Sequence, residues 1–187
     1  RWDMGYLGTY SEDRQAALDQ LMLEPARRLA DSRFVVAGPL YPADIEWPNN
    51  LERIEHIPPG DHRRFYNSQR FTLNVTRADM VRAGYSPSVR LFEAGACGTP
   101  IVSDYWPGLD ELFCPGREIL ICRSPDEALH VLRNVSEDER VSIGERLRAR
   151  VLREHTYADR AERVEQSALE LLERGRVVVH GHSAHGV

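Results

Sequence analysis

The side chains best placed to do chemistry lie in residues 86–104, where a short helix is predicted between a polar turn and a buried strand. Ser86 is a favourable N-cap and Pro87 suits the first helical position, because the N–H that proline lacks has no partner there. Gly98 is a helix stop, and the proline two positions later prevents the helix from resuming. The free N–H groups and positive dipole end of such a helix, beside Ser86 and Ser88, form a site for phosphate.

A single carboxylate, Glu93, lies farther along the same helix. Helical side chains lean toward the N-terminus, so Glu93 is expected to reach a group bound just beyond that phosphate. The alternative is an ordinary crossover helix whose glutamate is exposed and paired with Arg90. Val89, Phe92 and Ala96 recur at i, i+3 and i+7, and this spacing predicts the face that is buried.

The elements that must position these residues follow a regular order. Six apolar runs alternate with segments of helical length, which predicts an α/β fold, a doubly wound Rossmann-like parallel sheet of about six strands. The runs are 4–10, 33–39, 54–57, 71–76, 101–103 and 118–122, and helices are expected from Ser11, from Asp61 to about Ser68, over 87–97, 108–113 and 125–135, from Ser136, and over 157–172. Ligands of such sheets bind beyond the carboxyl ends of the strands. Those ends are the loops at Gly8, Pro39, Pro58, Thr76 and Asp104.

The expected core and the last helix are also read from apolar spacing. The core prediction comprises Val35, Val36, Leu73, Val75, Phe92, Ile101, Val102, Leu120 and Ile121. In the last helix, the residues expected to face inward are Ala161, Val164, Ala168, Leu171 and Leu172.

Length and composition fit one globular domain. The 187 residues are 42% hydrophobic and 28% charged, which is ordinary for a soluble domain. We expect a domain over 1–174 and a flexible tail over 175–187 with His180, His182 and His185. The net charge of −5 argues against nucleic-acid binding, and no apolar run approaches the roughly 20 residues of a transmembrane segment.

Cysteine usage and missing motifs narrow the class further. Three cysteines without metal spacing indicate reduced thiols, with Cys97 and Cys122 buried, and therefore a cytoplasmic protein. No dinucleotide fingerprint, phosphate-loop lysine or nucleophile-elbow serine is found. Because the chain begins at Arg1 and enters a strand almost at once, we expect it to be part of a longer protein.

Three short motifs carry a family resemblance. Residues 91–94 read Leu-Phe-Glu-Ala, residues 98–102 read Gly-Thr-Pro-Ile-Val, and residues 108–111 read Gly-Leu-Asp-Glu. In this order and spacing the chain resembles the nucleotide-sugar-binding half of the GT-B glycosyltransferases of group 1. It is most similar to the spore-maturation, CgeB-type branch, and the resemblance runs from about Tyr6 to about Arg163.

The resemblance implies a site for a nucleoside-diphosphate sugar, with uridine diphosphate (UDP) as the first expectation. Glu93 is implied to bind the ribose hydroxyls, and the N–H groups at the helix start to bind the diphosphate. Glu111 is implied to lie near the sugar, and the base to lie at the end of the third strand. The implied site comprises Gly8, Thr9, Arg14, Ile57, Pro58, Arg77, Ser86, Ser88, Val89, Arg90, Glu93 and Glu111. For each of the three arginines, an exposed salt bridge is an equal alternative.

The resemblance also implies what the chain does with such a ligand. It predicts the donor-binding domain of a glycosyltransferase that needs no bound metal or permanent cofactor, with an N-terminal acceptor domain missing from this chain. The family's earlier glutamate is replaced here by Tyr85, so neither catalytic residues nor sugar contacts are assigned. The alternatives are a non-catalytic regulatory or interaction module and half of a sugar-nucleotide epimerase.

Overall fold

The structure, a computed structural model, describes residues 1–181, and their side chains through residue 173. The chain divides into two compact units, Arg1–Val151 and Leu152–Val187. The first unit holds the sheet and every candidate site residue.

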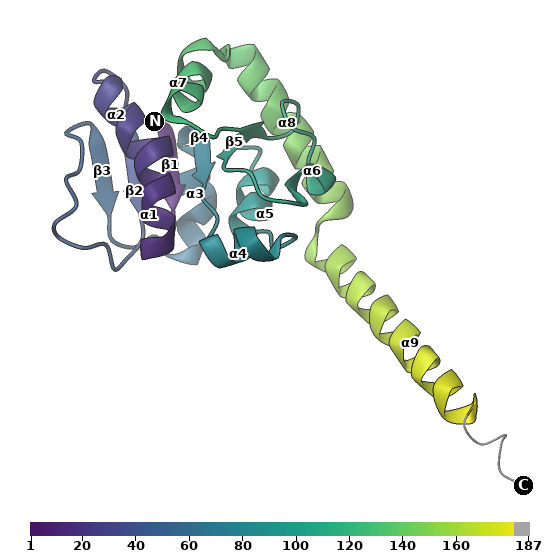
Figure 1. The fold of residues 1–187 in the computed structure, drawn as a ribbon. Helices are drawn as coiled ribbons and strands as arrows, with labels where there is room; N and C mark the ends of the chain where they lie inside the picture. Colours follow the sequence, from purple (N-terminus) through teal and green to yellow (C-terminus); the bar gives the residue numbers. More distant parts are fainter. Residues whose placement is uncertain (182–187) are drawn as a thin grey trace, which may run out of the picture. The chain divides into compact units, whose positions relative to one another are not determined.

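A six-stranded, wholly parallel sheet forms the centre of the first unit. Its strands are β1 (Trp2–Leu7), β2 (Phe34–Ala37), β3 (Leu51–Ile54), β4 (Gln69–Asn74), β5 (Ile101–Ser103) and β6 (Leu120–Ile121), in the order β3-β2-β1-β4-β5-β6. The predicted doubly wound α/β fold is confirmed. Because β2 and β3 lie on one side of β1 and β4 lies on the other, the strand order reverses between β1 and β4 (Figure 1). In sheets of this kind, ligands bind beyond the carboxyl ends of the strands at such a reversal.

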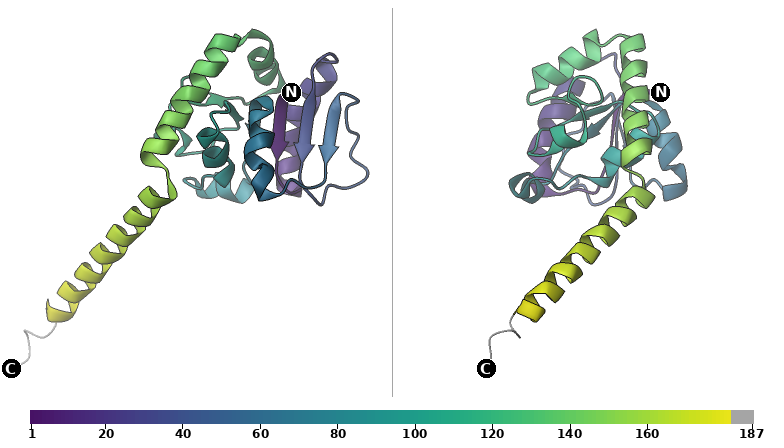
Figure 2. Two further views of the ribbon diagram at one scale, coloured as in Figure 1. Left: turned by 180° about the vertical axis from the view of Figure 1, so that it is seen from behind. Right: turned by 90° about the vertical axis from the view of Figure 1, so that its right-hand side faces the viewer.

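Helices cover both faces of the sheet. One face carries α1 (Glu12–Leu18), a π-helical turn (Asp19–Leu23), α2 (Glu24–Arg28) and α7 (Pro125–Asn134), and the other carries α3 (His62–Asn67), α5 (Val89–Ala96), α6 (Leu109–Leu112) and α8 (Glu137–Glu154), as Figures 1 and 2 show. Strand side chains alternate between the two cores. In β2, Phe34 and Val36 pack into the first core, and Val35 and Ala37 pack into the second.

Two elements differ from the sequence prediction. The third strand is Leu51–Ile54 rather than 54–57, because pairing with β2 sets Leu51 opposite Phe34 and the chain leaves the sheet after Ile54. Helix α4 (Ala78–Ala83) was not predicted. The backbone N–H of Ala78 donates to the carboxylate of Asp13 at 3.0 Å, so a residue distant in sequence caps this helix.

Helix α5 begins two residues later than predicted. Its N-cap is Ser88 rather than Ser86, and the Ser88 hydroxyl accepts a hydrogen bond from the N–H of Arg90. The predicted inward face is wrong at Val89, which is 55% exposed. Phe92 and Ala96 are half-buried against the second core, and the buried positions include Leu91, Ala94 and Gly95. The glycine decides which face packs: a Cβ at Gly95 would lie 2.8 Å from a methyl of Val151 in α8, so only glycine permits this close approach.

The core prediction holds in part. Val35, Val36, Leu73, Val75, Ile101 and Val102 are buried, whereas Phe92, Leu120 and Ile121 are half-buried. All three cysteines are free thiols; Cys122 is buried, and Cys97, predicted to be buried, is half-buried like Cys114.

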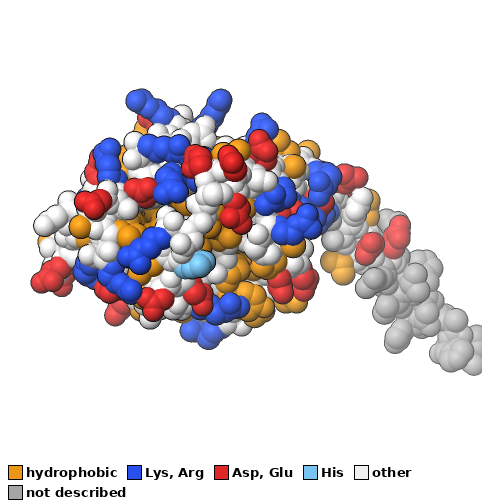
Figure 3. All heavy atoms as spheres, turned by 90° about the horizontal axis from the view of Figure 1, so that it is seen from above, with side chains coloured by type: hydrophobic (Ala, Val, Ile, Leu, Met, Phe, Trp, Pro, Cys, Tyr) orange, Lys and Arg blue, Asp and Glu red, His pale blue; other side chains and the backbone are white. Residues whose placement is uncertain are grey.

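Arginines at the amino-terminal edge of the sheet are paired with carboxylates. Arg70 lies 3.0 Å from Asp3, and Arg140 lies 2.6 Å from Glu137. On the face of the first unit seen in Figure 3, basic and acidic side chains lie side by side rather than gathered by sign. Partly exposed pairs of this kind contribute little to stability.

The second unit is dominated by α9 (Tyr157–Gly181). Its predicted inward face is wrong, because Val164 and Leu171 are 70% and 67% exposed. The helix also continues past the predicted end at residue 172. His182 and His185 lie outside the described residues, and the domain boundary at 174 stays a prediction. Within residues 1–181, no helix is long and apolar enough to cross a membrane.

Candidate functional site

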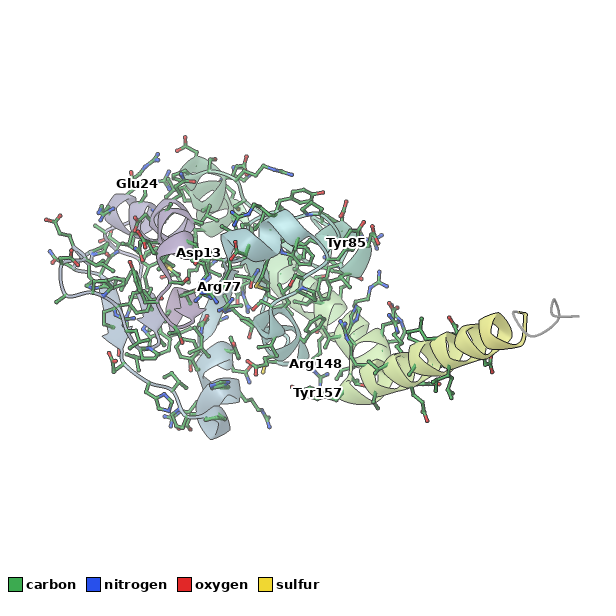
Figure 4. The ribbon with its side chains drawn as sticks, turned by 60° about the horizontal axis from the view of Figure 1, so that its bottom comes forward. Asp13, Glu24, Arg77, Tyr85, Arg148 and Tyr157 are labelled. Atoms are coloured by element: carbon green, nitrogen blue, oxygen red, sulfur yellow. The ribbon has the colours of Figure 1, made fainter. Side chains whose placement is uncertain are left out.

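Most of the predicted site residues lie at the carboxyl ends of β1 and β4. The loop after β1 contains Gly8 and Thr9, the loop after β4 contains Arg77, and α5 begins at the same edge of the sheet. Figure 4 brings this edge forward, and Asp13 and Arg77 lie next to each other there. The topology therefore brings together positions as far apart in the sequence as Leu7 and Arg90, which are separated by 83 residues.

Arg90 is the central cation of this site. It is the second residue of α5, is only 6% exposed, and lies with its guanidinium between the two strands. Its Nε donates to the carbonyl oxygen of Leu7 at 2.7 Å, and its Nη1 donates to Oδ1 of Asn74 at 2.8 Å. The guanidinium carbon also lies 4.7 Å from the centre of the Tyr6 ring. Within the described residues, the hydrogen bonds of Arg90 go to neutral oxygens, whereas Arg70 and Arg140 at the amino-terminal edge are paired with carboxylates.

A buried polar network fixes Asn74, the partner of Arg90. The Asn74 amide donates to the hydroxyl of Ser103 at 3.0 Å. The Asp104 carboxylate accepts from the N–H and hydroxyl of Thr76, at 2.8 and 2.9 Å. Burial raises the pKa of Asp104, although these hydrogen bonds oppose the shift. Neighbouring strands β4 and β5 thus hold the arginine through side chains at their carboxyl ends.

Gly8 is required by the close packing of its neighbours. A Cβ at this position would lie 2.6 Å from the Tyr6 hydroxyl and 2.8 Å from Nη2 of Arg90. The Gly8 carbonyl accepts a hydrogen bond from Tyr41 at 3.1 Å, which fixes the peptide that follows. Only glycine therefore lets the backbone pass over the guanidinium of Arg90.

The other two predicted cations differ in their surroundings. Arg14 donates to the carbonyl of Thr9 at 2.5 Å, and its buried Nε has no hydrogen-bond partner among the described residues. Arg77 lies 3.7 Å from the carboxylate of Asp13 and donates to the Ser11 hydroxyl at 3.1 Å. For Arg77, the structure therefore shows the alternative, a salt bridge, with Asp13 as the partner. The Ser11 hydroxyl, then the N–H of Ala78 and then Arg77 lower the pKa of Asp13.

Glu93 faces α3 rather than Arg90. Its Oε2 accepts from the Tyr66 hydroxyl at 3.3 Å and lies 3.6 Å from Nδ1 of His62. The other ring nitrogen of His62 lies 3.3 Å from the carbonyl oxygen of Ile57. His62 therefore links the predicted ribose-binding carboxylate to Ile57, near the predicted base position, while Pro58 is exposed. The alternative pairing of Glu93 with Arg90 is not what these contacts show.

Glu111 belongs to a separate cluster with two residues that the sequence did not assign to the site. Its Oε1 accepts from the hydroxyl of Tyr85 at 2.9 Å. The Tyr85 ring lies over Gly108, where a Cβ would be 2.6 Å from the ring. This hydrogen bond to Glu111 raises the pKa of the Tyr85 phenol.

Together these groups have the chemistry of an anion site next to a hydroxyl site. A buried guanidinium and the N–H groups at the start of a helix favour the binding of a phosphate. A half-buried carboxylate can accept hydrogen bonds from hydroxyl groups. No group of three or more histidine, cysteine, aspartate or glutamate side chains within the described residues is placed to hold a metal ion.

Residues 14–166 match the model of a protein family described as glycosyl transferase-like. The chain belongs to this family. Among curated proteins no sequence matches this glycosyl transferase-like chain.

Solved structures of glycosyltransferases share the fold of this glycosyl transferase-like domain. HepE from Anabaena, solved in complex with UDP-glucose, has a TM-score of 0.72 at 12% identity over 91% of this chain and 49% of that one. Sucrose-phosphate synthase from Thermosynechococcus elongatus has a TM-score of 0.66 at 12% identity, over 92% of this chain and 46% of the synthase. The C-terminal domain of the group 1 glycosyl transferase LpcC from Francisella tularensis has a TM-score of 0.64 at 14% identity, over 83% of this chain and 87% of the LpcC domain.

These matches establish the fold as half of a GT-B glycosyltransferase. The chain spans about half the length of HepE and of the synthase, and it covers most of the isolated LpcC domain. At these identities the likeness concerns the fold alone.

Besides Tyr85 and Gly108, four residues of the glycosyltransferase domain's site were missed by sequence reasoning. They are Tyr6, His62, Tyr66 and Asn74, and each contacts a predicted site residue. Asn74 carries the one usable signal, since an amide at the end of an otherwise apolar strand needs a buried partner. The other three sit in ordinary amphipathic patterns, so nothing local distinguishes them.

Proposed function

We propose that this domain binds a nucleoside-diphosphate sugar at the carboxyl ends of β1 and β4, as the donor half of a glycosyltransferase. The observation that carries the proposal is the buried Arg90 guanidinium at the start of α5, bonded to neutral oxygens of both strands. Among the described residues no carboxylate lies within ion-pair distance of Arg90, although Asp104 attracts it from farther away. A bound diphosphate would therefore supply a closer negative charge to a buried cation that is costly to desolvate.

The diphosphate is the leaving group in sugar transfer, and its negative charge grows as the glycosidic bond breaks. Arg90 and the N–H groups at Ser88 and Val89 are fixed before the ligand arrives, so they stabilise that charge without reorganising. Gly8 and Thr9 bring the backbone close, and Arg14 adds a second cation from α1. Ser86 lies in the turn that leads to these groups.

Glu93 and the segment at Ile57 complete the nucleoside side of the proposal. The Glu93 carboxylate accepts hydrogen bonds from the two ribose hydroxyls, and the base lies against Ile57 and Pro58. His62 contacts both Glu93 and the carbonyl of Ile57. UDP is the first nucleotide to test, because HepE was solved with UDP-glucose and with UDP.

The rest of the enzyme is part of the same proposal. The neighbours are about twice as long as this chain, so we place the acceptor in a second domain and expect this half to bind ligand better than it catalyses. Membership of the CgeB-type branch and a cytoplasmic location remain predictions. The regulatory-module alternative predicts no nucleotide binding at all.

Calorimetric titration with UDP and with uridine tests the proposal. UDP should bind at least tenfold more tightly than uridine, because only UDP reaches Arg90, and tenfold corresponds to about 1.4 kcal/mol. Glu93→Gln should weaken both ligands by roughly tenfold, since charge-assisted hydrogen bonds to the ribose are lost. Glu139→Gln, the same change on exposed α8, is the matched control and should leave both affinities unchanged.

Two results would contradict the proposal. One is failure of the diphosphates of uridine, guanosine and thymidine to bind at millimolar concentration. The other is an equal effect of the Glu93 and Glu139 substitutions, which would make Glu93 an ordinary surface glutamate.

A further inference from the structure

Tyr85 has a backbone conformation that its own residue type does not favour. Its φ is +52°, in the left-handed region, and the residue before it, Gly84, has a φ of +65°. Left-handed backbone is uncommon for a bulky residue and costs free energy. Such a residue needs a reason to be where it is.

Burial is not that reason, because the Tyr85 side chain is 67% exposed. Three contacts hold it instead. Its N–H donates to the carbonyl of Pro107 at 2.8 Å, its ring covers Gly108, and its hydroxyl donates to Glu111 at 2.9 Å. Gly108 is itself left-handed, with a φ of +96°. The result is a rigidly presented aromatic ring with a carboxylate at its tip.

The position of this ring follows from the topology. Tyr85 precedes Ser88, the N-cap of α5, by three residues, and Glu111 lies in α6, after the loop that follows β5. Both segments therefore belong to the carboxyl edge of the sheet, where α5 begins. If the diphosphate binds at the start of α5, the group attached to its outer phosphate is the sugar, and Tyr85 is the exposed aromatic nearest in sequence to that helix start.

We propose that Tyr85 adds an aromatic platform to the sugar end of the site, where the resemblance already implies Glu111, and that the two residues select a neutral pyranose over one that carries a carboxylate. This inference rests on the proposed function. The aromatic face stacks against the C–H groups of a sugar ring. The second oxygen of Glu111 accepts sugar hydroxyls, and the charges of Glu111 and its exposed neighbour Asp110 repel an acidic sugar.

The test compares UDP, UDP-glucose and UDP-glucuronate, since the last two differ only in a carboxylate at the sugar. The unmodified chain should bind UDP-glucuronate at least tenfold more weakly than UDP-glucose. Glu111→Gln should narrow that difference severalfold. Tyr85→Leu should weaken the affinity for UDP-glucose about fivefold and change the affinity for UDP by less than about twofold. Tyr85→Phe should keep most of the UDP-glucose affinity. Tyr157→Leu, at an exposed tyrosine of α9, is the matched control.

The outcomes separate this inference from the proposed function. Equal affinity for UDP-glucose and UDP-glucuronate overturns the inference, as does a loss of UDP affinity in Tyr85→Leu equal to its loss of UDP-glucose affinity. Failure of UDP itself to bind the unmodified chain overturns the proposed function, and the inference with it. Thermal unfolding of each variant shows whether Tyr85→Leu still folds, and Tyr85→Phe and Glu111→Gln keep the test decisive if it does not.

Discussion

Replacing Arg90 by methionine should destabilise the domain as well as remove ligand binding. Methionine fills the stem of the arginine but leaves the carbonyl of Leu7 and the amide oxygen of Asn74 without their donors, which lie at 2.7 and 2.8 Å in the native protein. An acceptor left unsatisfied in the interior costs about 1–3 kcal/mol. Two such losses are offset in part because a buried charge no longer has to be desolvated.

The expected net loss for Arg90→Met is therefore about 2–4 kcal/mol in the free energy of unfolding. Urea denaturation measures it directly: with a slope of about 2 kcal/mol per molar, the midpoint should fall by roughly 1–2 M. Arg90→Lys separates charge from geometry, because lysine keeps the cation but cannot span both strands with a planar fork. It should lie between the native protein and the methionine variant.

A midpoint shift below about 0.3 M for Arg90→Met, which corresponds to well under 1 kcal/mol, would refute this reasoning. It would mean that water or a neighbour replaces the guanidinium at no cost, and that Arg90 is not part of the packed interior. A lysine variant as stable as the native protein would show instead that charge alone is needed and the two-strand geometry is not.

Three further outcomes follow from the packing and the charges. Burial raises the pKa of Cys122 to about 12, so a thiol reagent at pH 8 should modify this residue only after denaturant is added, as counted by mass spectrometry. The Arg140 hydrogen bond lowers the pKa of Glu137 to about 2, so the stabilisation from this pair is present above pH 4.5 and is lost as the pH falls through 2. Because the pair is partly exposed, Glu137→Gln should lower the urea midpoint only slightly at pH 7 and approach the native value at pH 2. Gly95→Ala would place a Cβ 2.8 Å from a methyl of Val151 and should cost about 1–3 kcal/mol of stability by overpacking, measurable by thermal unfolding.

The sheet could be predicted from the sequence because its signals are local. Runs such as 33–39 are apolar and end at glycine and proline, and most of the runs are followed by a helix, although a loop joins β2 to β3. The edge that carries the site follows from strand order alone. Helix α4 could not be predicted in this way, since the carboxylate that caps Ala78 comes from Asp13, 65 residues earlier.

The location of the site could be predicted from the sequence better than its geometry could. Arg90 on a short helix resembles a surface arginine, and its burial depends on Leu7 and Asn74 in strands that meet only after folding. The left-handed backbone of Tyr85 is set by Pro107 and Gly108 on another loop. In both cases the deciding partner is distant in sequence, so no periodicity or capping rule could specify the contact.

The phosphate end and the sugar end of the proposed site are built in different ways, and the difference has a physical consequence. Arg90 is fixed by buried groups of two strands, so a change there disturbs the core. Tyr85 and Glu111 are exposed and joined by one hydrogen bond between a loop and a short helix, so they can change at little cost to stability. A diphosphate is common to all nucleoside-diphosphate sugars, whereas the sugar varies. Selection for a new donor would therefore act on the exposed pair, while the buried cation stays constant because the fold itself depends on it.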